Sequence, residues 1–465
     1  MKKLLALGVL CIGAASSALA GGLLTNTNQS VHFLRNPARD ASTEVDAAYT
    51  NPAGTTQLSD GFHFSITNQS VSQTRTITST FAPFAGNVGN LGVATKEYKG
   101  TADAPVVPSF QFAYKEGKWA LSGGFAITGG GGKATFANGL ASFEAPLAMI
   151  PVGLSNPTPP TPAIATTKYS VDGYMEGQQF IYGAQINGSY KITDELSAAL
   201  GVRVNFVESS YKGHLLNINI NPVFAGNPTG AMISASTFFT TIGKPANAAA
   251  TKDIYVDVTQ SGMGITPIIG LNYNHRDLNI GMKYELKTSL EVKNKTTVDN
   301  TLPQKYPDGA TTPNDIPALL TVGAEYKVIP ALKLSAGYHH FFDSDAKMAN
   351  DKQQYINGGV NEILFGAEYD VTDKLLVSAG GQTTNTGVTD AYQTDMSFSL
   401  SSYSIGLGAA YKIMPNLKVN VAYFFTNYDK WTKVVTSGYN GTPLGGTDEF
   451  MRTNKVIGVG LDYNF

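Results

Sequence analysis

Residues Asn454–Phe465 read NKVIGVGLDYNF, and side chains of two kinds alternate along this stretch. From Ile457 to Phe465 every second residue is apolar, and the residues between them are small or polar. Successive side chains of a β-strand point to opposite faces, so the pattern predicts a strand with one apolar face. In a water-soluble sheet the small, polar face would point to water. In an outer-membrane barrel it would line the lumen, and the apolar face would meet lipid.

The first twenty residues favour the outer-membrane interpretation. Two lysines precede the apolar run Leu4–Ala15, and a small-x-small site ends at Ala20. A basic start, a short apolar centre and small residues together predict a secretory signal peptide over residues 1–20, with Gly21 as the first mature residue. The apolar run is too short to cross a bilayer as a helix.

Cysteine use and charge exclude several classes of protein. Cys11 is the one cysteine, and it follows Leu10 where a lipoprotein site needs a small residue, so we expect no lipidation there. Cleavage after Ala20 would leave a mature chain without disulfides or a thiol nucleophile. Loss of the two signal-peptide lysines takes the basic count from 33 to 31 against 35 acidic residues. This balance does not indicate nucleic-acid binding.

The composition fits a chain whose apolar residues are spread over many short segments. Hydrophobic residues make up 42% of the chain and charged residues only 15%, yet no apolar run of about twenty residues follows the signal peptide. Alternating strands account for apolar character without a spanning helix. The 49 glycines suit a crowded lumen wall, and the 23 tyrosines suit the aromatic girdles of a barrel.

The remaining chain predicts about fourteen strands, beginning at Gly61. Alternating segments are joined by tight turns and by long connections in strict succession, as in the pair of strands on either side of Glu116-Gly117-Lys118. Outer-membrane barrels have short periplasmic turns, longer extracellular loops and an even number of strands. We therefore predict an all-β fold: an antiparallel transmembrane barrel over residues 61–465. The closing strand is expected to pair with the first strand near Phe62–Thr67.

Residues 21–60 do not have a barrel pattern. They carry several charges, among them Arg35 and Arg39, and they contain Asn51-Pro52-Ala53-Gly54, a sequence that favours turns and caps. A flexible leader is one interpretation. A plug folded inside the barrel is the favoured one, because the apolar residues Leu23, Leu24, Phe33 and Leu34 would be unnecessary in a solvated linker.

Charged residues on the predicted polar faces carry both signs and are expected to pair inside the barrel, mainly as structural partners of the wall and plug. They are Lys191, Arg203, Lys283, Glu285, Lys287, Glu325, Glu368, Lys412, Lys418 and Asp462.

Signs of catalysis are weak. There is no nucleophile-elbow serine, no phosphate-binding glycine loop and no cysteine ligand set. His339 and His340 are adjacent in a predicted strand, so they would point to opposite faces and could not share a metal ion. We predict no enzyme activity, no cofactor and no metal site. A hydrolase whose groups meet only in space is a less favoured alternative.

Two long connections are unusually apolar. One covers Leu140–Ile164, and the other, Leu215–Ile242, contains several large apolar residues. Exposed apolar surface of this kind indicates a binding site for an apolar ligand, unless the loops bury it by packing on each other.

Taken together, these features resemble the FadL/TodX-type outer-membrane transport proteins, which admit long-chain fatty acids and other hydrophobic compounds. The similarity covers the predicted mature chain. It rests on Asn51-Pro52-Ala53-Gly54 before the first strand, on the glycine run Gly129, Gly130, Gly131 and Gly132 in the third strand, on the apolar loops, and on Phe465, which resembles the C-terminal assembly signal of outer-membrane proteins. The polar segment Thr296–Pro313 departs from the family pattern.

The resemblance implies a monomeric barrel in the Gram-negative outer membrane, closed by a hatch at residues 21–60 and opened sideways by the kink at the glycine run. Passive uptake of fatty acids, hydrocarbons or aromatics would follow, with outer-membrane lipids, lipopolysaccharide and the assembly machinery as further partners. Ligand contacts are expected at Leu23, Leu24, Phe33, Leu34, Leu215, Leu216, Phe224, Met232, Phe238 and Phe239. The alternative function is a surface binding or adhesion barrel without transport.

Overall fold

The first and last strands of the chain lie side by side and close a β-barrel. The computed structural model describes residues 23–157 and 162–465, so the predicted signal peptide lies outside the described residues. Fourteen antiparallel strands form the wall. They are β1 (Gly61–Thr80), β2 (Thr95–Glu116), β3 (Trp119–Phe136), β4 (Tyr169–Lys191), β5 (Leu196–Ile220), β7 (Ile254–His275), β8 (Leu278–Glu285), β11 (Leu319–Ile329), β12 (Leu332–Phe341), β13 (Val360–Asp370), β14 (Leu375–Asn385), β15 (Ser402–Met414), β16 (Leu417–Tyr428) and β18 (Gly446–Asn464).

Four short strands complete the sheet. β9 (Glu291–Asp299) pairs with β7 further along the barrel than β8 does, and β17 (Trp431–Val435) extends the line of β16 along β18. β10 (Thr311–Pro313) pairs with β9, and β6 (Ile233–Ser234) pairs with the end of β5. The count of about fourteen predicted from the sequence is confirmed.

The closing strand pairs with β1 along its whole length. The ladder begins at His63 opposite Asn464 and continues to Thr80 opposite Thr447. The backbone N–H of Phe465 donates to the carbonyl of Phe62 at 2.9 Å. This confirms the predicted pairing of the last and first strands.

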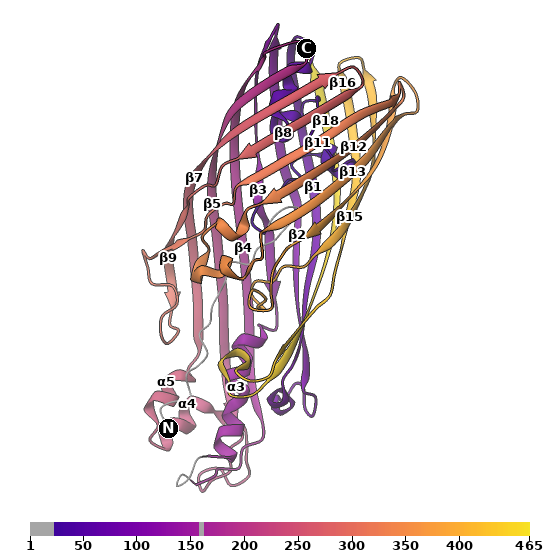
Figure 1. The fold of residues 1–465 in the computed structure, drawn as a ribbon. Coiled ribbons are helices and arrows are strands. Elements are labelled where there is room, and N and C mark those ends of the chain that lie inside the picture. Colours follow the sequence, from indigo (N-terminus) through magenta and orange to yellow (C-terminus); the bar gives the residue numbers. More distant parts are fainter. Residues whose placement is uncertain (1–22, 158–161) are drawn as a thin grey trace.

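Connections at the two ends of the barrel differ in length. The turns beside the C-terminus contain two to four residues, whereas the opposite end carries long loops with helices (Figure 1). Several strands reach further into the long loops than the alternation of apolar residues predicts: β2 begins at Thr95, β4 begins at Tyr169 and β5 ends at Ile220. Leu215 and Leu216 were expected in a loop but belong to β5. Backbone pairing continues beyond the lipid-facing band, where side chains no longer need to be apolar.

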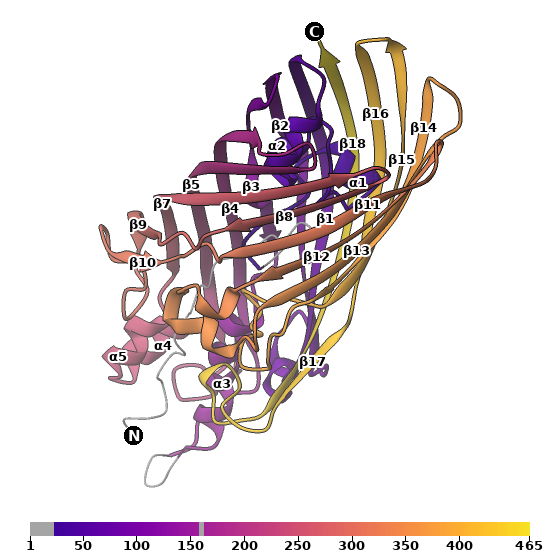
Figure 2. The same cartoon turned by 45° about the horizontal axis from the view of Figure 1, so that its top comes forward.

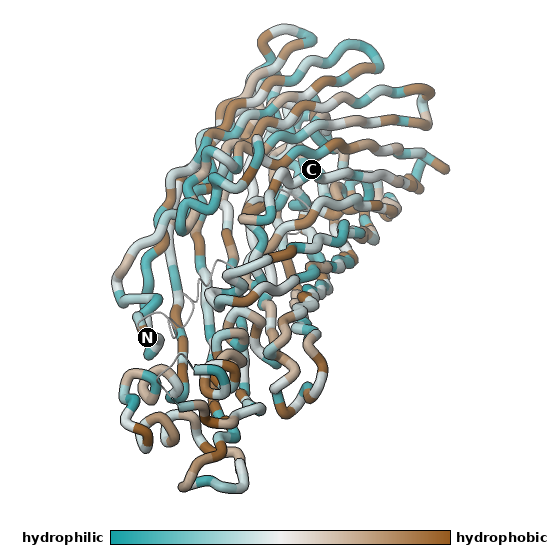
Figure 3. Tube along the Cα trace, turned by 60° about the horizontal axis from the view of Figure 1, so that its bottom comes forward, coloured by the Kyte–Doolittle hydropathy of each residue, from teal (hydrophilic) through white to brown (hydrophobic). Residues whose placement is uncertain are grey.

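The outer surface is apolar, and the hydropathy of successive residues alternates along the strands (Figure 3). Aromatic residues gather next to the short turns: Phe62, Trp119, Tyr190, Tyr273, Tyr326, Tyr369, Tyr411 and Phe465 are all exposed. Such a girdle marks the interface between hydrocarbon and head groups.

Helices lie in the loops and in the lumen. The long loops contain α3 (Ala141–Ser155), α4 (Ala235–Thr241), α5 (Pro245–Ala250) and the 3₁₀ turns η2 (Ala82–Gly86), η3 (Asp343–Asp345), η4 (Ala349–Tyr355) and η5 (Tyr439–Gly441). The segment before the barrel contains α1 (Val31–Arg35), α2 (Ala47–Thr50) and η1 (Pro52–Gln57). Among the described residues, no helix has the length and apolar character that a transmembrane helix needs.

Residues 23–60 are called the plug segment below, and all but the exposed Ser59 and Asp60 at its end lie within the barrel (Figure 2). From Leu23 to Thr56 every residue is buried except Thr43 and Glu44, which are half-buried. A segment with this burial cannot be a solvated leader, since its polar groups have left water and need partners in the wall.

Candidate functional site

Glycines in the wall make room for the plug segment. A Cβ atom added at Gly460 would lie 2.7 Å from Cγ1 of Val31, and one at Gly458 would collide with the side chain of Leu34. The same holds for Gly281, Gly366, Gly380, Gly406 and Gly408, where an added Cβ would meet other plug residues. The small face of the closing strand therefore provides clearance for the plug segment.

Replacement of Gly458 by valine is expected to lower stability by about 1–3 kcal/mol, because the added side chain overpacks the contact with Leu34. Thermal unfolding of the purified barrel measures the loss. The control is Gly188→Val, since an added Cβ at this exposed strand glycine meets nothing within 4 Å. Equal melting temperatures for the two variants would contradict close packing of the plug segment on β18.

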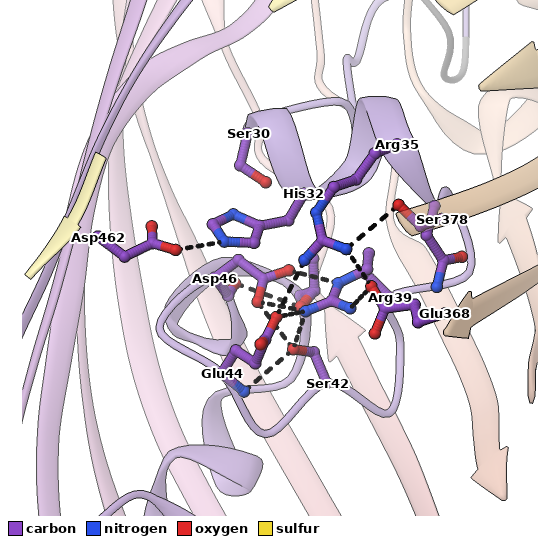
Figure 4. Close-up of polar contacts among 12 residues, drawn as sticks. Ser30, His32, Arg35, Arg39, Ser42, Glu44, Asp46, Glu368, Ser378 and Asp462 are labelled. Atoms are coloured by element: carbon purple, nitrogen blue, oxygen red, sulfur yellow. Dashed lines mark hydrogen bonds and ion pairs between the residues drawn. The ribbon is translucent and has the colours of Figure 1, made fainter. Parts of the chain in front are cut away.

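A cluster of ion pairs holds the centre of the plug segment to the wall (Figure 4). Arg39 donates through Nε to Asp46 at 2.7 Å and through Nη1 to Glu368 of β13 at 3.3 Å. Arg35 donates to the same Glu368 oxygen at 2.5 Å. Glu44 receives hydrogen bonds from Arg39 at 2.8 Å and from Lys418 of β16 at 3.1 Å. Charges of opposite sign therefore connect the plug segment with two strands.

The electrostatics of this cluster keep its groups ionised. Burial alone would raise the pKa of the Glu44 carboxyl, but Lys418 and Arg39 hold it well below the usual range. Burial would likewise raise the pKa of Asp46, and Arg39 lowers it. Burial would lower the pKa of Arg39, yet Asp46 and Glu368 raise it well above the ordinary value. Because every member needs its partners, removal of one leaves an uncompensated buried charge.

A second contact joins Asp40 of the plug segment to the wall. His339 of β12 lies between Asp40 and Glu362, at 2.8 Å from an oxygen of each. His340 points to the other face, where its Nδ1 lies 2.9 Å from Asn361 Oδ1. The prediction that the two histidines face opposite ways is confirmed.

The element Asn51-Pro52-Ala53-Gly54 docks on strands β4 and β7. Asn51 donates to Asn272 Oδ1 at 2.6 Å and to the carbonyl of Ser42 at 3.0 Å. The carbonyl of Pro52 accepts from Ser189 Oγ at 2.8 Å. The motif thus anchors the end of the plug segment immediately before β1 begins.

The backbone pairing between β2 and β3 is interrupted, and this interruption is called the gap below. In the described chain the two strands pair at Thr101 with Thr135 and pair again only at Phe110 with Phe125. On the β3 side, Gly130, Gly131 and Gly132 have φ of 68°, 120° and 101°, which turn the strand out of line. On the β2 side, Pro105 and Pro108 lack the N–H that a ladder needs.

The start of the plug segment takes the place of the missing partner. The N–H of Asn26 donates to the carbonyl of Thr128 at 2.8 Å, and its side chain donates to the carbonyl of Gly130 at 2.8 Å. Thr25 forms a bridge with Gly129. A movement of residues 25–29 would therefore expose the edge of β3 inside the barrel.

A small cavity of about 20 Å³ lies next to this gap. The residues that line it include Tyr49 of the plug segment, Arg203 of the wall, and Phe110 and Phe125. The last two are exposed on the outer, lipid-facing side. The cavity is thus bordered both by lumen residues and by residues of the outer surface.

The ten candidate ligand residues do not form one site. Leu215, Phe224, Phe238 and Phe239 belong to an apolar cluster of the extracellular loops and upper wall, which also includes α3. Leu23 and Leu24 pack with residues of β11, β12 and the loops that follow. Phe33 and Leu34 belong to a third cluster, which reaches Val107 and Ile127 at the gap. Met232 is exposed, and Leu216 is half-buried.

The loops bury many of the apolar side chains of the two long connections that the sequence analysis singled out. Phe238 and Phe239 are fully buried, and Tyr306, from the polar segment Thr296–Pro313, stacks on Tyr211 at 6.0 Å. Glu144 ties α3 to the barrel, accepting from Tyr98 at 2.8 Å and from Tyr169 at 2.9 Å. The loops therefore form a packed cap on the extracellular end.

Most of the charged residues that the sequence analysis expected to face the lumen do face it. Arg203 contacts both oxygens of Glu285, at 2.6 and 2.8 Å, and Lys283 reaches Glu285 at 2.7 Å and the carbonyl of Tyr49 at 2.9 Å. Glu325, Glu368, Lys418 and Asp462 pair within the lumen as well. Lys287 and Lys412 are exposed and Lys191 is half-buried, since they lie close to strand ends.

A buried carboxyl in an extracellular loop connects the plug segment with the loops. Asp343 accepts from the backbone N–H of Val360 at 3.2 Å and from that of Leu23. Burial raises the pKa of this carboxyl to about 7. The folded loop therefore retains a proton that the unfolded chain, with an aspartate pKa near 4, releases.

The protection of this loop's backbone amides against hydrogen exchange should be greatest at low pH. It should decline as pH rises from about 4 through 7, by at most about tenfold per pH unit. Hydrogen exchange of peptides over residues 343–360, compared with Asp343→Asn at each pH, measures the effect. The amide stays neutral, so the ratio between variant and wild type should grow with pH. A constant ratio would contradict a buried, protonated Asp343.

Some contacts were not anticipated from the sequence. His339 was considered only as a metal ligand, and its role as a partner of Asp40 was missed, although its place on an inward face could have indicated one. Pro105 and Pro108 were also missed as the counterpart of the glycine run. Within residues 23–157 and 162–465, no three histidine, aspartate or glutamate side chains lie together as a metal site.

Solved structures of similar fold cover almost the whole chain. The crystal structure of a Pseudomonas aeruginosa FadL homologue covers 96% of this chain and 100% of its own, with a TM-score of 0.65 and 14% identity. The chain has the FadL/TodX fold. The P. putida toluene transporter TodX matches over 91% of this chain and 95% of its own, with a TM-score of 0.54 and 16% identity. For the Ralstonia pickettii toluene transporter TbuX the shares are 92% and 98%, with a TM-score of 0.51 and 18% identity.

Sequence comparison is less informative. No family model matches the chain. Outer membrane protein P1 of Haemophilus influenzae is 23% identical over 308 residues, which is 60% of this chain and 64% of that protein. The alignment thus spans less than two thirds of this relative.

The FadL/TodX fold agrees with the apolar exterior and the aromatic girdle. A closed antiparallel barrel pairs its backbone groups strand to strand and leaves no open sheet edge, so the chain crosses the Gram-negative outer membrane with its strands. The solved structures with this fold named above are described as transporters or a FadL homologue, not as enzymes.

Proposed function

We propose that this protein is a passive channel through which hydrophobic compounds enter across the outer membrane. Ligand is taken up at the extracellular loops, passes the plug segment, and leaves sideways into the membrane between β2 and β3. The observation that carries the proposal is the interrupted pairing of β2 and β3, occupied from inside by Asn26 and bordered by apolar residues.

The energetics favour this route over a water-filled pore. An apolar ligand gains roughly 0.8 kcal/mol for each methylene that leaves water. In this route the filled lumen allows no free diffusion towards the periplasmic end, because ion pairs and Asn51 bind the plug segment to the wall. Passage therefore requires a ligand-linked shift of the start of the plug segment, residues 25–29, which carries no charged side chain.

The position of each segment in the barrel indicates its role in the proposed transport. The plug segment, residues 23–60, acts as the hatch. Leu23, Leu24, Phe33 and Leu34 present its apolar surface, and Met232 with Phe224 lies at the outer loops. One chain forms a complete barrel, closed by β1 and β18, and the proposed channel works as a monomer.

Uptake by intact cells tests the proposal. Cells that lack their own channels of this type and express this protein should take up labelled octanoate and toluene faster than cells with an empty vector. Folding is checked by the altered gel migration of an unheated barrel. Uptake equal to that of the empty-vector cells, with a folded barrel, would reject transport and leave surface binding or adhesion as the function.

A further inference from the structure

Tyr49 of α2 connects two parts of the plug segment. The helix itself is docked on the wall, since the carbonyl of Ala48 accepts from Asn187 Nδ2 at 2.9 Å and the carbonyl of Tyr49 accepts from Lys283 Nζ at 2.9 Å. The side chain of Tyr49 reaches the start of the plug segment, where its hydroxyl donates to the carbonyl of Asn26 at 3.2 Å. Tyr49 therefore joins the docked helix to the residue that bonds to the edge of β3.

Two cations of the wall hold the ring of Tyr49. The ammonium of Lys283 lies 4.3 Å from the centre of the ring, and the guanidinium carbon of Arg203 lies 4.8 Å from it. Both cations also donate to Glu285, Lys283 at 2.7 Å and Arg203 at 2.6 Å. Because Glu285 compensates both charges, the ring can move away without leaving a buried cation unpaired.

The hydrogen bond from Tyr49 to Asn26 can break in the same way. The carbonyl of Asn26 also accepts from Gln29 Nε2, so it keeps a donor when the hydroxyl leaves. The hydroxyl in turn has other acceptors close by. Thr27 and Thr321 line the same cavity as Tyr49, and within the part of the chain that the structure describes their hydroxyl oxygens have no hydrogen-bond partner. Release therefore leaves no buried polar group without a partner in reach.

Tyr49 lines two cavities in the lumen. One has a volume of about 10 Å³ and is also lined by Phe33, a candidate ligand residue. The other has a volume of about 20 Å³ and lies at the gap, where Phe110 and Phe125 border it. A ligand that moves from Phe33 towards the gap therefore meets the ring of Tyr49.

We propose that Tyr49 is the positioning residue that couples the arrival of a ligand to the release of the plug segment at the gap. A ligand that pushes the ring aside breaks the bond to Asn26 and frees residues 25–29 from the edge of β3. The inference rests on the transport function proposed above and assigns its regulation to one side chain. Residues 25–29 carry no charge that would hold them otherwise.

Hydrogen exchange of the purified protein in nanodiscs, without ligand, tests the bond. Tyr49→Phe keeps the ring between the cations and removes the hydroxyl. Peptides over residues 23–30 should exchange about two- to tenfold faster than in wild type, as the loss of one hydrogen bond implies. Peptides over residues 36–46 should not change, since ion pairs hold them. The control is Tyr114→Phe, which removes a hydroxyl bonded to Glu116 at 2.8 Å next to a short turn and should exchange as wild type does.

Uptake distinguishes this role from that of a purely structural contact. Cells with Tyr49→Phe should take up octanoate and toluene faster than wild type, by up to about tenfold at low concentration, because the released state is more populated. Loss of a purely structural contact would lower uptake or leave it unchanged. In wild type, toluene should speed the exchange of residues 23–30, and this effect should be smaller in Tyr49→Phe.

Equal exchange of residues 23–30 in Tyr49→Phe and wild type overturns the proposed role. Faster exchange with unchanged or lower uptake overturns the coupling to the ligand and leaves the transport function intact. No uptake by wild type rejects the transport function, and the coupling fails with it. If Tyr49→Phe does not fold, the effect of toluene on wild type decides: faster exchange of residues 23–30 supports the coupling, and unchanged exchange overturns it.

Discussion

Arg39→Met is expected to open the barrel to ions. The substitution removes the group that joins Asp46, Glu44 and Glu368, and leaves these carboxylates buried with too few cations. Breaking a buried pair from one side costs about 3–5 kcal/mol. The plug segment should therefore leave its docked position in a large fraction of molecules, and single-channel recording in planar bilayers should detect a conductance that wild type lacks.

The matched control is Arg276→Met, the same substitution in an exposed short turn. It should behave as wild type. Because the carboxylates repel each other once Arg39 is gone, protonating them should restore closure, so the conductance of Arg39→Met should fall at acidic pH. A variant as closed as wild type at neutral pH would show that the ion pairs of Figure 4 do not hold the plug segment in place.

Straightening the glycine run is expected to abolish most uptake while leaving the barrel folded. In Gly130→Val/Gly131→Val, β-branched residues replace glycines whose φ values are 68° and 120°. Such residues avoid positive φ, at a cost of about 1–3 kcal/mol each, so the strand should relax towards regular pairing with β2. Octanoate and toluene uptake by cells measures the result.

The corresponding control places valine at Gly188, a strand glycine with free space around its Cα and no positive φ. Its uptake should equal that of wild type. Unchanged uptake in the double variant, with folding confirmed by gel migration, would count against an exit through this part of the wall.

The architecture could be predicted from the sequence because it depends on patterns among residues close together in the chain. Alternation of apolar and polar residues defines the strands, and loop length distinguishes the two barrel ends. Glycines were expected to suit a crowded lumen wall, and Gly458 of the closing strand does leave room for Leu34 of the plug segment. Strand ends were less accessible: β5 extends to Ile220, since backbone pairing persists where the side chains carry no apolar signal.

The site was only partly accessible, because its contacts join residues far apart in the chain. Asp40 meets His339, and Asn51 meets Asn272, and no local pattern specifies either pair. The glycine run was recognised, but the break in pairing also depends on Pro105 and Pro108 of the preceding strand. The apolar loop residues were visible, whereas the packing that buries Phe238 depends on contacts between loops.

A reversible crosslink across the gap tests the sideways exit most directly. A Cβ atom added at Gly132 lies 3.9 Å from that of Ala104, within the usual range for a disulfide, and the predicted mature chain has no other cysteine. Because Gly132 has a φ of 101°, a cysteine there strains the strand by itself, so each variant is compared with itself before and after oxidation. In Ala104→Cys/Gly132→Cys, oxidation should stop most of the remaining uptake of octanoate and toluene, and a thiol reductant should restore it to the level before oxidation, while each single variant stays insensitive to both. Equal uptake by the oxidised and reduced double variant would contradict passage between β2 and β3.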